Sequence, residues 1–241
     1  MKERADKLLS DRGLVASRSQ AKSLIEKGDV TVNGVVIKKA SEPVDVDAEI
    51  LVNVPLYVGR GAFKLEKALE EFKISAAGKI CADIGASTGG FTEVLLMNGA
   101  EKVYAIDVGH GQLAKKLQEE PKVINMEGTN IKDLHELPEE AELAVMDLSF
   151  ISITKVLANV VKLIRPGGDL IALIKPQFEA GRDRLPKDGV VKDVKLRELI
   201  LEEVMEAFLK GGWIHHETIV SPIEGKTGNV EFLSHFTKAK D

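Results

Sequence analysis

Residues 79–92, KICADIGASTGGFT, decide the fold of this 241-residue chain. An apolar run ends in an acid, three glycines follow, and a second apolar run comes after them. This order predicts a strand, a sharp turn and a helix whose free backbone N–H groups face a ligand. Asp107 ends the next apolar run, KVYAID, at close to the ~20 residues expected between such a turn and a ribose-binding acid. The stretch therefore predicts a nucleotide-like ligand, although the glycines alone also suit an ordinary strand-to-helix turn.

The spacing of the glycines favours one class of cofactor. A dinucleotide site follows G-x-G-x-x-G, where the second glycine lets the backbone approach a pyrophosphate, and that position is Ser87 here. Asp83 would place a negative charge beside phosphates, whereas it suits a ligand that carries an ammonium and a sulfonium. We therefore expect S-adenosyl-L-methionine rather than NAD.

The predicted cofactor contacts follow from this placement of the ligand over the turn. They are Asp83, Gly85, Ala86, Ser87, Thr88, Gly89, Gly90 and Phe91 at the turn, Asp107 on the ribose, and Thr129 and Asn130 near the adenine. For Asn130, a role in forming a turn is an equally good explanation.

The composition is that of an ordinary soluble globular protein, with 44% hydrophobic and 29% charged residues. No apolar run approaches the ~18 residues of a membrane span, and the start, MKERADKLLSDRG, lacks the apolar segment of a signal peptide, so we expect a cytoplasmic protein. The single cysteine, Cys81, excludes an intramolecular disulfide and any cysteine-rich metal site. His215 and His216 are adjacent and would face opposite sides of a strand, so no metal site is expected.

The net charge of -5 is unevenly distributed. Residues 1–39 contain nine Lys or Arg and five acids, a balance of +4, which leaves -9 for the remainder. A basic module joined to an acidic one suggests a polyanion as the partner of the first. Charge alone slightly favours a solvated face with no partner.

The chain divides by pattern into residues 1–58 and 59–241, with residues 54–61 as a linker. The first part reads as two short helices and a small strand set. Ser17 is placed to cap the second helix, Gly28 to end it, and Asn33-Gly34 to turn a hairpin.

Strands and helices alternate in the second part. A helix is predicted over residues 62–72, and others over residues 111–120 and 153–168, the last ended by its glycines. This alternation predicts an α/β fold, a Rossmann-like doubly wound parallel sheet with helices on both faces. The two strand patterns after residue 212 predict a terminal hairpin that adds an antiparallel strand.

A family resemblance explains the basic module. Residues 13–34, GLVASRSQAKSLIEKGDVTVNG, resemble the S4 domain, a small α+β RNA-binding module found in several RNA enzymes. In that family the second helix and its approach contact RNA. The resemblance therefore implies RNA-binding roles for Arg4, Arg12, Arg18, Lys22 and Lys27.

Four charged residues, Lys64, Asp147, Lys175 and Glu231, stand in GRGAFKLEKAL, MDLSFIS, IKPQFEAG and GNVEFL. Each alone would be an ordinary exposed charge. Together they resemble the lysine, aspartate, lysine, glutamate tetrad of the FtsJ-like ribose 2′-O-methyltransferases. With the preceding S4-like module, the chain resembles most closely the TlyA/hemolysin A group, which implies methylation of cytidine ribose in ribosomal RNA and a partner that is ribosomal RNA or a ribosomal subunit.

The chemistry of this reaction explains such a tetrad. A ribose 2′-hydroxyl must attack a methyl carbon in line and lose its proton, so orientation and proton removal dominate. Lys175 would either take the proton or, as a cation, stabilise the developing alkoxide, while Asp147, Lys64 and Glu231 orient it and balance charge.

Further residues are expected to contact the RNA. Arg60 is expected to bind RNA. The polar loop of residues 177–192, with Arg182, Arg184 and Lys187, would clamp RNA beside the site, although an ordinary mobile loop is at least as good an explanation. Phe150 would stack on an extruded base, although burial in the core is the commoner fate of a phenylalanine.

Three other functions remain open at this point. They are a catalytically inert ribosome-binding or assembly factor, a membrane-active hemolysin, and a methyltransferase that acts on a base instead of a ribose. The sequence indicates neither the target nucleotide nor the oligomeric state.

Overall fold

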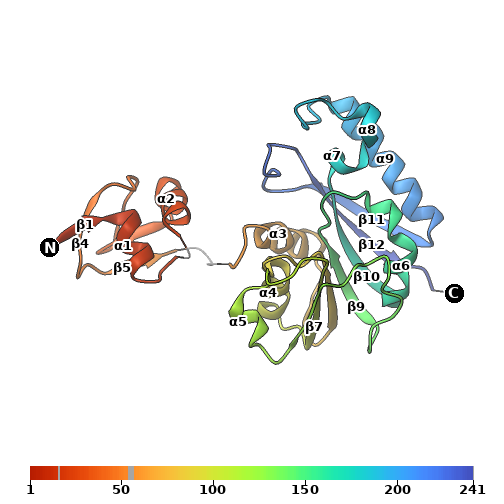
Figure 1. Cartoon of the computed structure of the whole chain (residues 1–241), viewed down its shortest axis with the longest axis horizontal. Helices are drawn as coiled ribbons and strands as arrows, with labels where there is room; N and C mark the ends of the chain where they lie inside the picture. Colours follow the sequence, from red (N-terminus) through yellow and green to blue (C-terminus); the bar gives the residue numbers. More distant parts are fainter. Residues whose placement is uncertain (16, 54–56, 241) are drawn as a thin grey trace. The chain divides into compact units, whose positions relative to one another are not determined.

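The computed structural model describes residues 1–15, 17–53 and 57–240. These residues form two compact units, Met1–Val58 and Gly59–Asp241 (Figure 1). Each unit has its own hydrophobic core. The change from one unit to the other falls within the predicted linker, of which residues 54–56 lie outside the described part.

The first unit combines short helices with short strands. In chain order its described elements are β1 (Lys2–Arg4), α1 (Ala5–Asp11), α2 (Arg18–Lys27), β2 (Val30–Val32), β3 (Val35–Val36), β4 (Pro43–Asp45) and β5 (Ile50–Val52). β1 pairs antiparallel with β4, and β2 lies between β3 and β5. Leu9 of α1 and Ile25 of α2 are fully buried in the core of this unit.

The predicted turn and cap residues act as expected in this unit. Ser17 Oγ accepts a hydrogen bond from Gln20 N at 3.2 Å and so caps α2. Gly28 ends that helix with φ of 86°. Asn33 and Gly34 both have positive φ, as a two-residue hairpin turn between β2 and β3 requires.

The second unit is built on a seven-stranded sheet. Its described elements are α3 (Ala62–Phe72), β6 (Ile80–Ile84), α4 (Gly90–Met97), β7 (Lys102–Asp107), α5 (Lys115–Gln118), β8 (Val123–Glu127), β9 (Ala141–Met146), η1 (Ile153–Lys155), α6 (Leu157–Leu163), β10 (Ile164–Ile174), α7 (Pro176–Glu179), α8 (Gly181–Arg184), α9 (Val194–Lys210), β11 (Trp213–Val220) and β12 (Phe232–Lys238). The strand order is β11-β12-β10-β9-β6-β7-β8.

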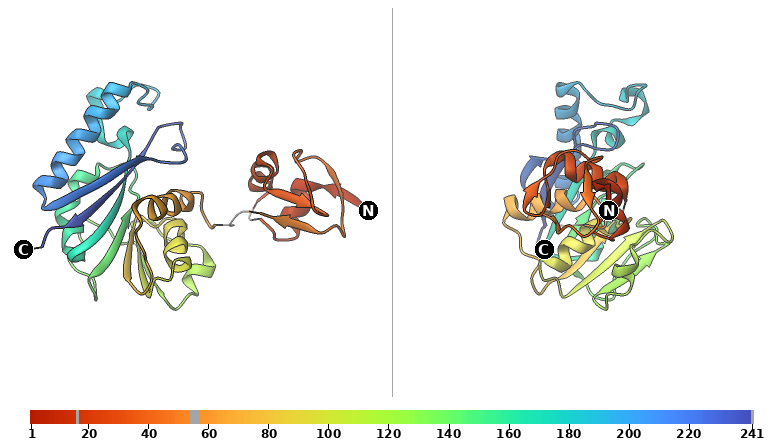
Figure 2. Two further views of the ribbon diagram at one scale, coloured as in Figure 1. Left: turned by 180° about the vertical axis from the view of Figure 1, so that it is seen from behind. Right: turned by 90° about the vertical axis from the view of Figure 1, so that its left-hand side faces the viewer.

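Five strands, β6 to β10, run parallel, whereas β12 runs antiparallel to both of its neighbours, β10 and β11. The helix α9 packs along β11 (Figure 2). The predicted α/β fold with an antiparallel terminal strand is confirmed. None of the helices in the described ranges is long and apolar enough to span a bilayer.

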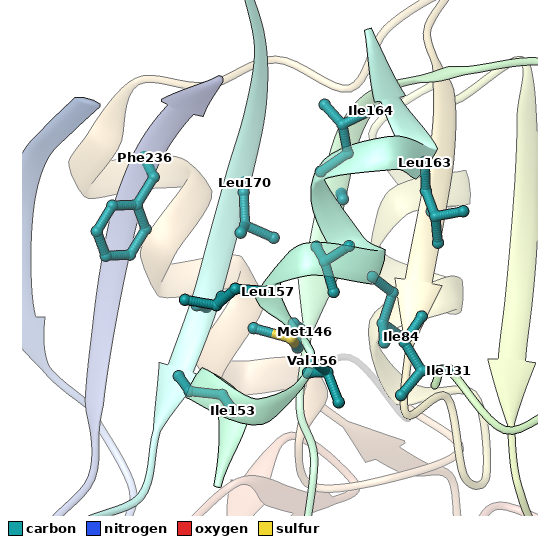
Figure 3. Close-up of a cluster of buried hydrophobic side chains, with 14 of the residues drawn as sticks. Ile84, Ile131, Met146, Ile153, Val156, Leu157, Leu163, Ile164, Leu170 and Phe236 are labelled. Atoms are coloured by element: carbon teal, nitrogen blue, oxygen red, sulfur yellow. The ribbon is translucent and has the colours of Figure 1, made fainter. Parts of the chain in front are cut away.

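Both faces of the sheet are covered, because successive residues of a strand point to opposite faces and Cys81, Ala82, Asp83 and Ile84 of β6 are all buried. On one face, Ile84 and Met146 pack with Leu157 of α6 in the larger core (Figure 3). The site is built at the carboxyl ends of these strands.

Two predicted helices are shorter than expected. Residues 111–120 contain only the single turn α5, because the backbone at Ala114 is extended, with ψ of 137°, and the helix begins after it. Residues 153–168 break into η1 and α6, and the chain leaves the helix at Ile164, which pairs with Ala141 of β9. Pro166 explains the exit, since it disfavours helical backbone in the residue before it.

Candidate active site

A cavity of about 480 Å³ opens at the carboxyl ends of β6, β7 and β9. In parallel α/β sheets, ligands bind at this edge. Its wall contains apolar side chains from these strands together with Asp107, Asp147 and the Thr129-Asn130 segment. The volume lies within the range of small-molecule sites.

Gly85 allows the turn after β6 to pass close to the end of β9. Its φ is 91°, and a Cβ atom there would lie 2.4 Å from Asp147 O. Any other residue would force the two strand ends apart. The glycine that the sequence placed in the turn is therefore required by packing as well as by conformation.

Asp107 is fixed at the cavity wall by the turn itself. Its Oδ2 accepts from Ser87 N at 2.8 Å and its Oδ1 from Gly109 N at 2.7 Å. Ser87 takes positive φ, 48°, to make this contact, and its Oγ bonds Gln112 Oε1 at 3.1 Å. A carboxylate held in this way can accept hydrogen bonds from the two hydroxyls of a ribose.

Asp83 lies behind the cavity wall and is fully buried. Its Oδ2 accepts from Thr92 N at 2.8 Å and from Thr92 Oγ1 at 2.7 Å, so it ties β6 to the first turn of α4. Its Oδ1 has no hydrogen-bond partner among the described residues. Burial raises the pKa of this carboxyl to about 7.

The predicted cofactor residues thus fall into two groups. Those that line the cavity are Gly85, Ser87, Asp107, Thr129 and Asn130. Those behind it are Asp83 in β6 and, in the turn and the helix start, Ala86, Thr88, Gly89, Gly90 and Phe91. The apolar walls suit an adenine ring and the carboxylate suits a ribose, so the residues present fit S-adenosylmethionine.

The tetrad comes together as two ion pairs. Lys64 Nζ of α3 lies 2.6 Å from Glu231 Oε2, next to β12. Lys175 Nζ, directly after β10, lies 2.5 Å from Asp147 Oδ1, directly after β9. Lys64, Lys175 and Glu231 are buried, with exposed fractions of 6%, 7% and 3%. Such buried charges need the partners that they have here.

Three residues beside the tetrad were not predicted. Lys175 Nζ donates to Ser149 Oγ at 2.8 Å and lies 5.7 Å from the centre of the Phe178 ring. Gln177 Nε2, two residues after Lys175, donates to Glu231 Oε1 of the other ion pair at 3.0 Å. All three stand within three residues of tetrad members in the sequence, but only the fold shows which way they point.

Phe150 is 91% exposed, so the expectation of burial in the core is wrong. Its φ is 65°, and its ring lies 5.2 Å from that of Phe178 at a tilt of 49°. The loop is anchored just beyond it, because Glu179 accepts from Ser152 Oγ at 2.6 Å and from Ile153 N at 2.9 Å. Phe150 therefore stands at the rim of the cavity, which it lines.

The arginines and lysines predicted to bind RNA have different surroundings. Arg12 Nη1 donates to Ala48 O at 2.7 Å, and its other terminal nitrogen bonds Val46 O. Arg184 binds Glu203 through two hydrogen bonds, at 2.8 and 2.7 Å. These two guanidinium groups are engaged within the protein.

The remaining predicted RNA contacts lie on the surface. They are Arg4 and Arg18, which share Asp6, together with Lys22, Lys27, Arg60 and Arg182. Lys132 and Lys226, which were not predicted, line the cavity and add positive charge there. The described residues contain no cluster of three or more His, Cys, Asp or Glu that could hold a metal ion.

Comparison with known proteins places both units in known families. The model of the FtsJ-like methyltransferase family matches residues 57–238, and that of the S4 domain matches residues 3–50. The protein named Hemolysin A from Brachyspira hyodysenteriae is 44% identical over 97% of this chain and 99% of its own length. The 16S/23S rRNA (cytidine-2′-O)-methyltransferase TlyA from Mycobacterium tuberculosis is 43% identical over 95% of this chain and 88% of its own.

A solved structure from Streptococcus thermophilus, 41% identical, aligns with a TM-score of 0.76 over 99% of this chain and 89% of its own. Likeness in fold therefore extends over the same length as likeness in sequence.

Proposed function

Because the chain belongs to the FtsJ-like methyltransferase family and carries an S4 domain, we propose that it transfers a methyl group from S-adenosylmethionine to the ribose 2′-hydroxyl of a cytidine in ribosomal RNA. The observation that carries the proposal is the two ion pairs, Lys64 with Glu231 and Lys175 with Asp147, of which Asp147 lines a nucleoside-sized cavity. In this proposal residues 1–58 bind RNA and residues 59–241 carry the chemistry.

The cofactor, when bound, supplies the electrophilic methyl group. Gly85 and Ser87 would hold it along the cavity, Asp107 would bind its ribose, and the Thr129-Asn130 segment would contact its adenine. The turn residues behind the wall, Asp83 among them, keep this edge in shape. Ile84, Ile106 and Leu148 provide an apolar lining that excludes water from the reacting groups.

Lys175 handles the hydroxyl. An ammonium group has three N–H donors; that of Lys175 donates one hydrogen bond, to Ser149 Oγ, and its contact with Asp147 Oδ1 is an ion pair. A remaining donor is directed to the 2′-oxygen, which it orients and, as negative charge develops, stabilises. If Lys175 reacts in its neutral form, the same position lets Nζ take the proton.

Lys64 and Glu231 support the position of Lys175. Gln177 donates to Glu231 and follows Lys175 by two residues, so the second ion pair holds the Lys175 loop in place. The two pairs together carry no net charge. The site thus offers donors and acceptors to the ribose without adding uncompensated charge to a buried region.

Phe150 and Phe178 present an aromatic surface at the rim. An exposed ring beside the site suits stacking with the base of the target nucleotide once it leaves its helix. Lys226 and Lys132 are placed to meet the phosphates that flank it.

Transfer of labelled methyl groups to purified ribosomal subunits tests the proposal. Digestion of the product to nucleosides separates 2′-O-methylcytidine from a methylated base. Lys175→Ala should abolish transfer while S-adenosylmethionine binding, measured by calorimetry, persists. Lys162→Ala, which removes an exposed lysine of α6, is the matched control and should leave turnover unchanged. Normal turnover by Lys175→Ala would contradict the assigned role.

A further inference from the structure

The N-terminal unit contains one buried carboxylate that binds two arginines. Asp6 accepts from Arg4 Nε at 3.0 Å and Arg4 Nη2 at 2.9 Å, and from Arg18 Nη2 at 3.1 Å. Its Oδ1 also accepts from Lys7 N at 2.9 Å. The Asp6 side chain is only 8% exposed, whereas those of Arg4 and Arg18 are 52% and 53% exposed. A hidden acid therefore holds two accessible cations side by side.

The two arginines come from different elements. Arg4 ends β1 and precedes α1, and Arg18 is the first residue of α2. Without a shared partner, two long side chains on separate elements would sample many rotamers. Asp6 fixes their positions relative to each other, and the bonds to it use only two of the five N–H donors of Arg4 and one of those of Arg18. Among the described residues the remaining donors have no other hydrogen-bond partner, so they stay available to a ligand.

We propose that Asp6 is a positioning residue for RNA binding: it orients Arg4 and Arg18 as one guanidinium pair that contacts the phosphate backbone of the RNA. This inference rests on the proposed RNA substrate. Planar guanidinium groups bind phosphate oxygens through paired hydrogen bonds, and a pair that is already ordered loses less side-chain entropy on binding. Phosphate contacts of this kind set the position of a protein on RNA and carry no sequence information.

The direction in which Asp6→Asn changes RNA affinity distinguishes a positioning role from an effect of charge alone. Asp6→Asn removes a negative charge from beside the two arginines, so charge alone predicts tighter binding to RNA. Positioning predicts the opposite result. We expect the full-length Asp6→Asn protein to bind purified ribosomal subunits about tenfold more weakly, the change produced by 1.4 kcal/mol. The slope of log Kd against log salt should fall by about 0.7 to 0.9 for each phosphate that the variant no longer neutralises.

A double-mutant cycle excludes a merely structural role. In an Arg4→Ala/Arg18→Ala background, Asp6→Asn should cause no further loss of binding, because the groups it positions are gone. A variant that only destabilises the unit would lose affinity in both backgrounds. Arg4→Lys gives a second measure if Asp6→Asn does not fold: it keeps the charge but cannot make the two-point bond, and binding should weaken.

Asp11→Asn is the matched control, because Asp11 lies on the same helix and is 54% exposed. It should leave binding unchanged or slightly tighter. The turnover number at saturating RNA should be normal in every variant, with the change confined to KM. Equal or tighter binding by folded Asp6→Asn, or equal losses in both backgrounds, would overturn the inference. Absence of methyl transfer by the unaltered protein would instead refute the proposed function.

Discussion

Removing Glu231 should destabilise the second unit far more than removing an exposed charge of α3, the helix that carries its partner. Lys64 Nζ lies 2.6 Å from Glu231 Oε2, and the two side chains are 7% and 3% exposed. Glu231→Ala leaves the Lys64 ammonium buried without its partner, which costs about 3–5 kcal/mol. Gln177 Nε2 loses its acceptor as well.

Replacing both charges should restore most of this loss. In Lys64→Met/Glu231→Leu no charge of this pair remains buried, and exchanging a buried ion pair for apolar side chains is often neutral in stability. The double variant should be folded but inactive, which separates the contribution of the pair to stability from its contribution to methyl transfer. Lys67→Ala, on the same helix, is the control: Lys67 is 41% exposed, and solvent screens its ion pairs with Glu70 and Glu71, so its removal should change stability very little.

The assay uses the single tryptophan of the chain. Trp213 is 2% exposed and lies in β11, so its fluorescence during urea unfolding reports the second unit alone. With an m-value of about 2 kcal/mol/M, a loss of about 4 kcal/mol moves the midpoint by about 2 M. A shift for Glu231→Ala no larger than that for Lys67→Ala would refute the reasoning, as would a double variant no more stable than the single one.

Three further predictions concern residues around the site. Burial raises the pKa of Asp83 from 3.8 to about 7, so the folded state binds this proton more tightly than the unfolded state does, and stability is lost as the pH rises towards and through 7. Between pH 4 and 8 the free energy of unfolding of the wild type should fall by up to about 4 kcal/mol relative to that of Asp83→Asn. Parallel pH profiles of the two proteins would contradict the shift. Gly85→Ala should abolish folding of the second unit, because the added Cβ would lie 2.4 Å from Asp147 O. Gly111→Ala is the control: this glycine also has positive φ, but nothing among the described residues lies within 4 Å of an added Cβ, so the change should cost only about 1–2 kcal/mol of stability. Equal urea midpoints for the two variants would count against the packing argument. Phe150→Ala should leave the urea midpoint unchanged, because Phe150 is 91% exposed. It should raise KM for ribosomal RNA about tenfold, which lies within the ~1–3 kcal/mol of a base-stacking contact. An unchanged KM would exclude Phe150 from base binding.

Local signals in the sequence were sufficient for much of the fold. The turn in residues 79–92, the helix over residues 62–72 and the Asn33-Gly34 hairpin all follow from interactions between near neighbours in the chain. Glycine conformation, capping and the apolar period act over a few residues, so a sequence reveals them.

Contacts between residues far apart in the sequence determine the features that the sequence did not predict. The helix expected over residues 111–120 begins only after the extended Ala114, in a segment whose backbone binds Glu127 of β8, and Arg12 is engaged by carbonyls of residues 46 and 48. The family resemblance identified the four tetrad residues, but it did not predict which of them pair. That Lys64 binds Glu231 and Lys175 binds Asp147 depends on the order of strands in the sheet.

The position of β12 in the sheet has a consequence for synthesis of the protein. β12 is the last strand in chain order, yet it lies between β10 and β11, and Glu231 directly precedes it. Until this strand has left the ribosome, the edges of β10 and β11 have no partner between them and Lys64 has no counter-ion. A nascent chain that has made everything up to residue 230 is thus both catalytically incomplete and prone to association through open strand edges. Activity should therefore appear only once residues 231–238 have emerged and β12 has paired with β10 and β11.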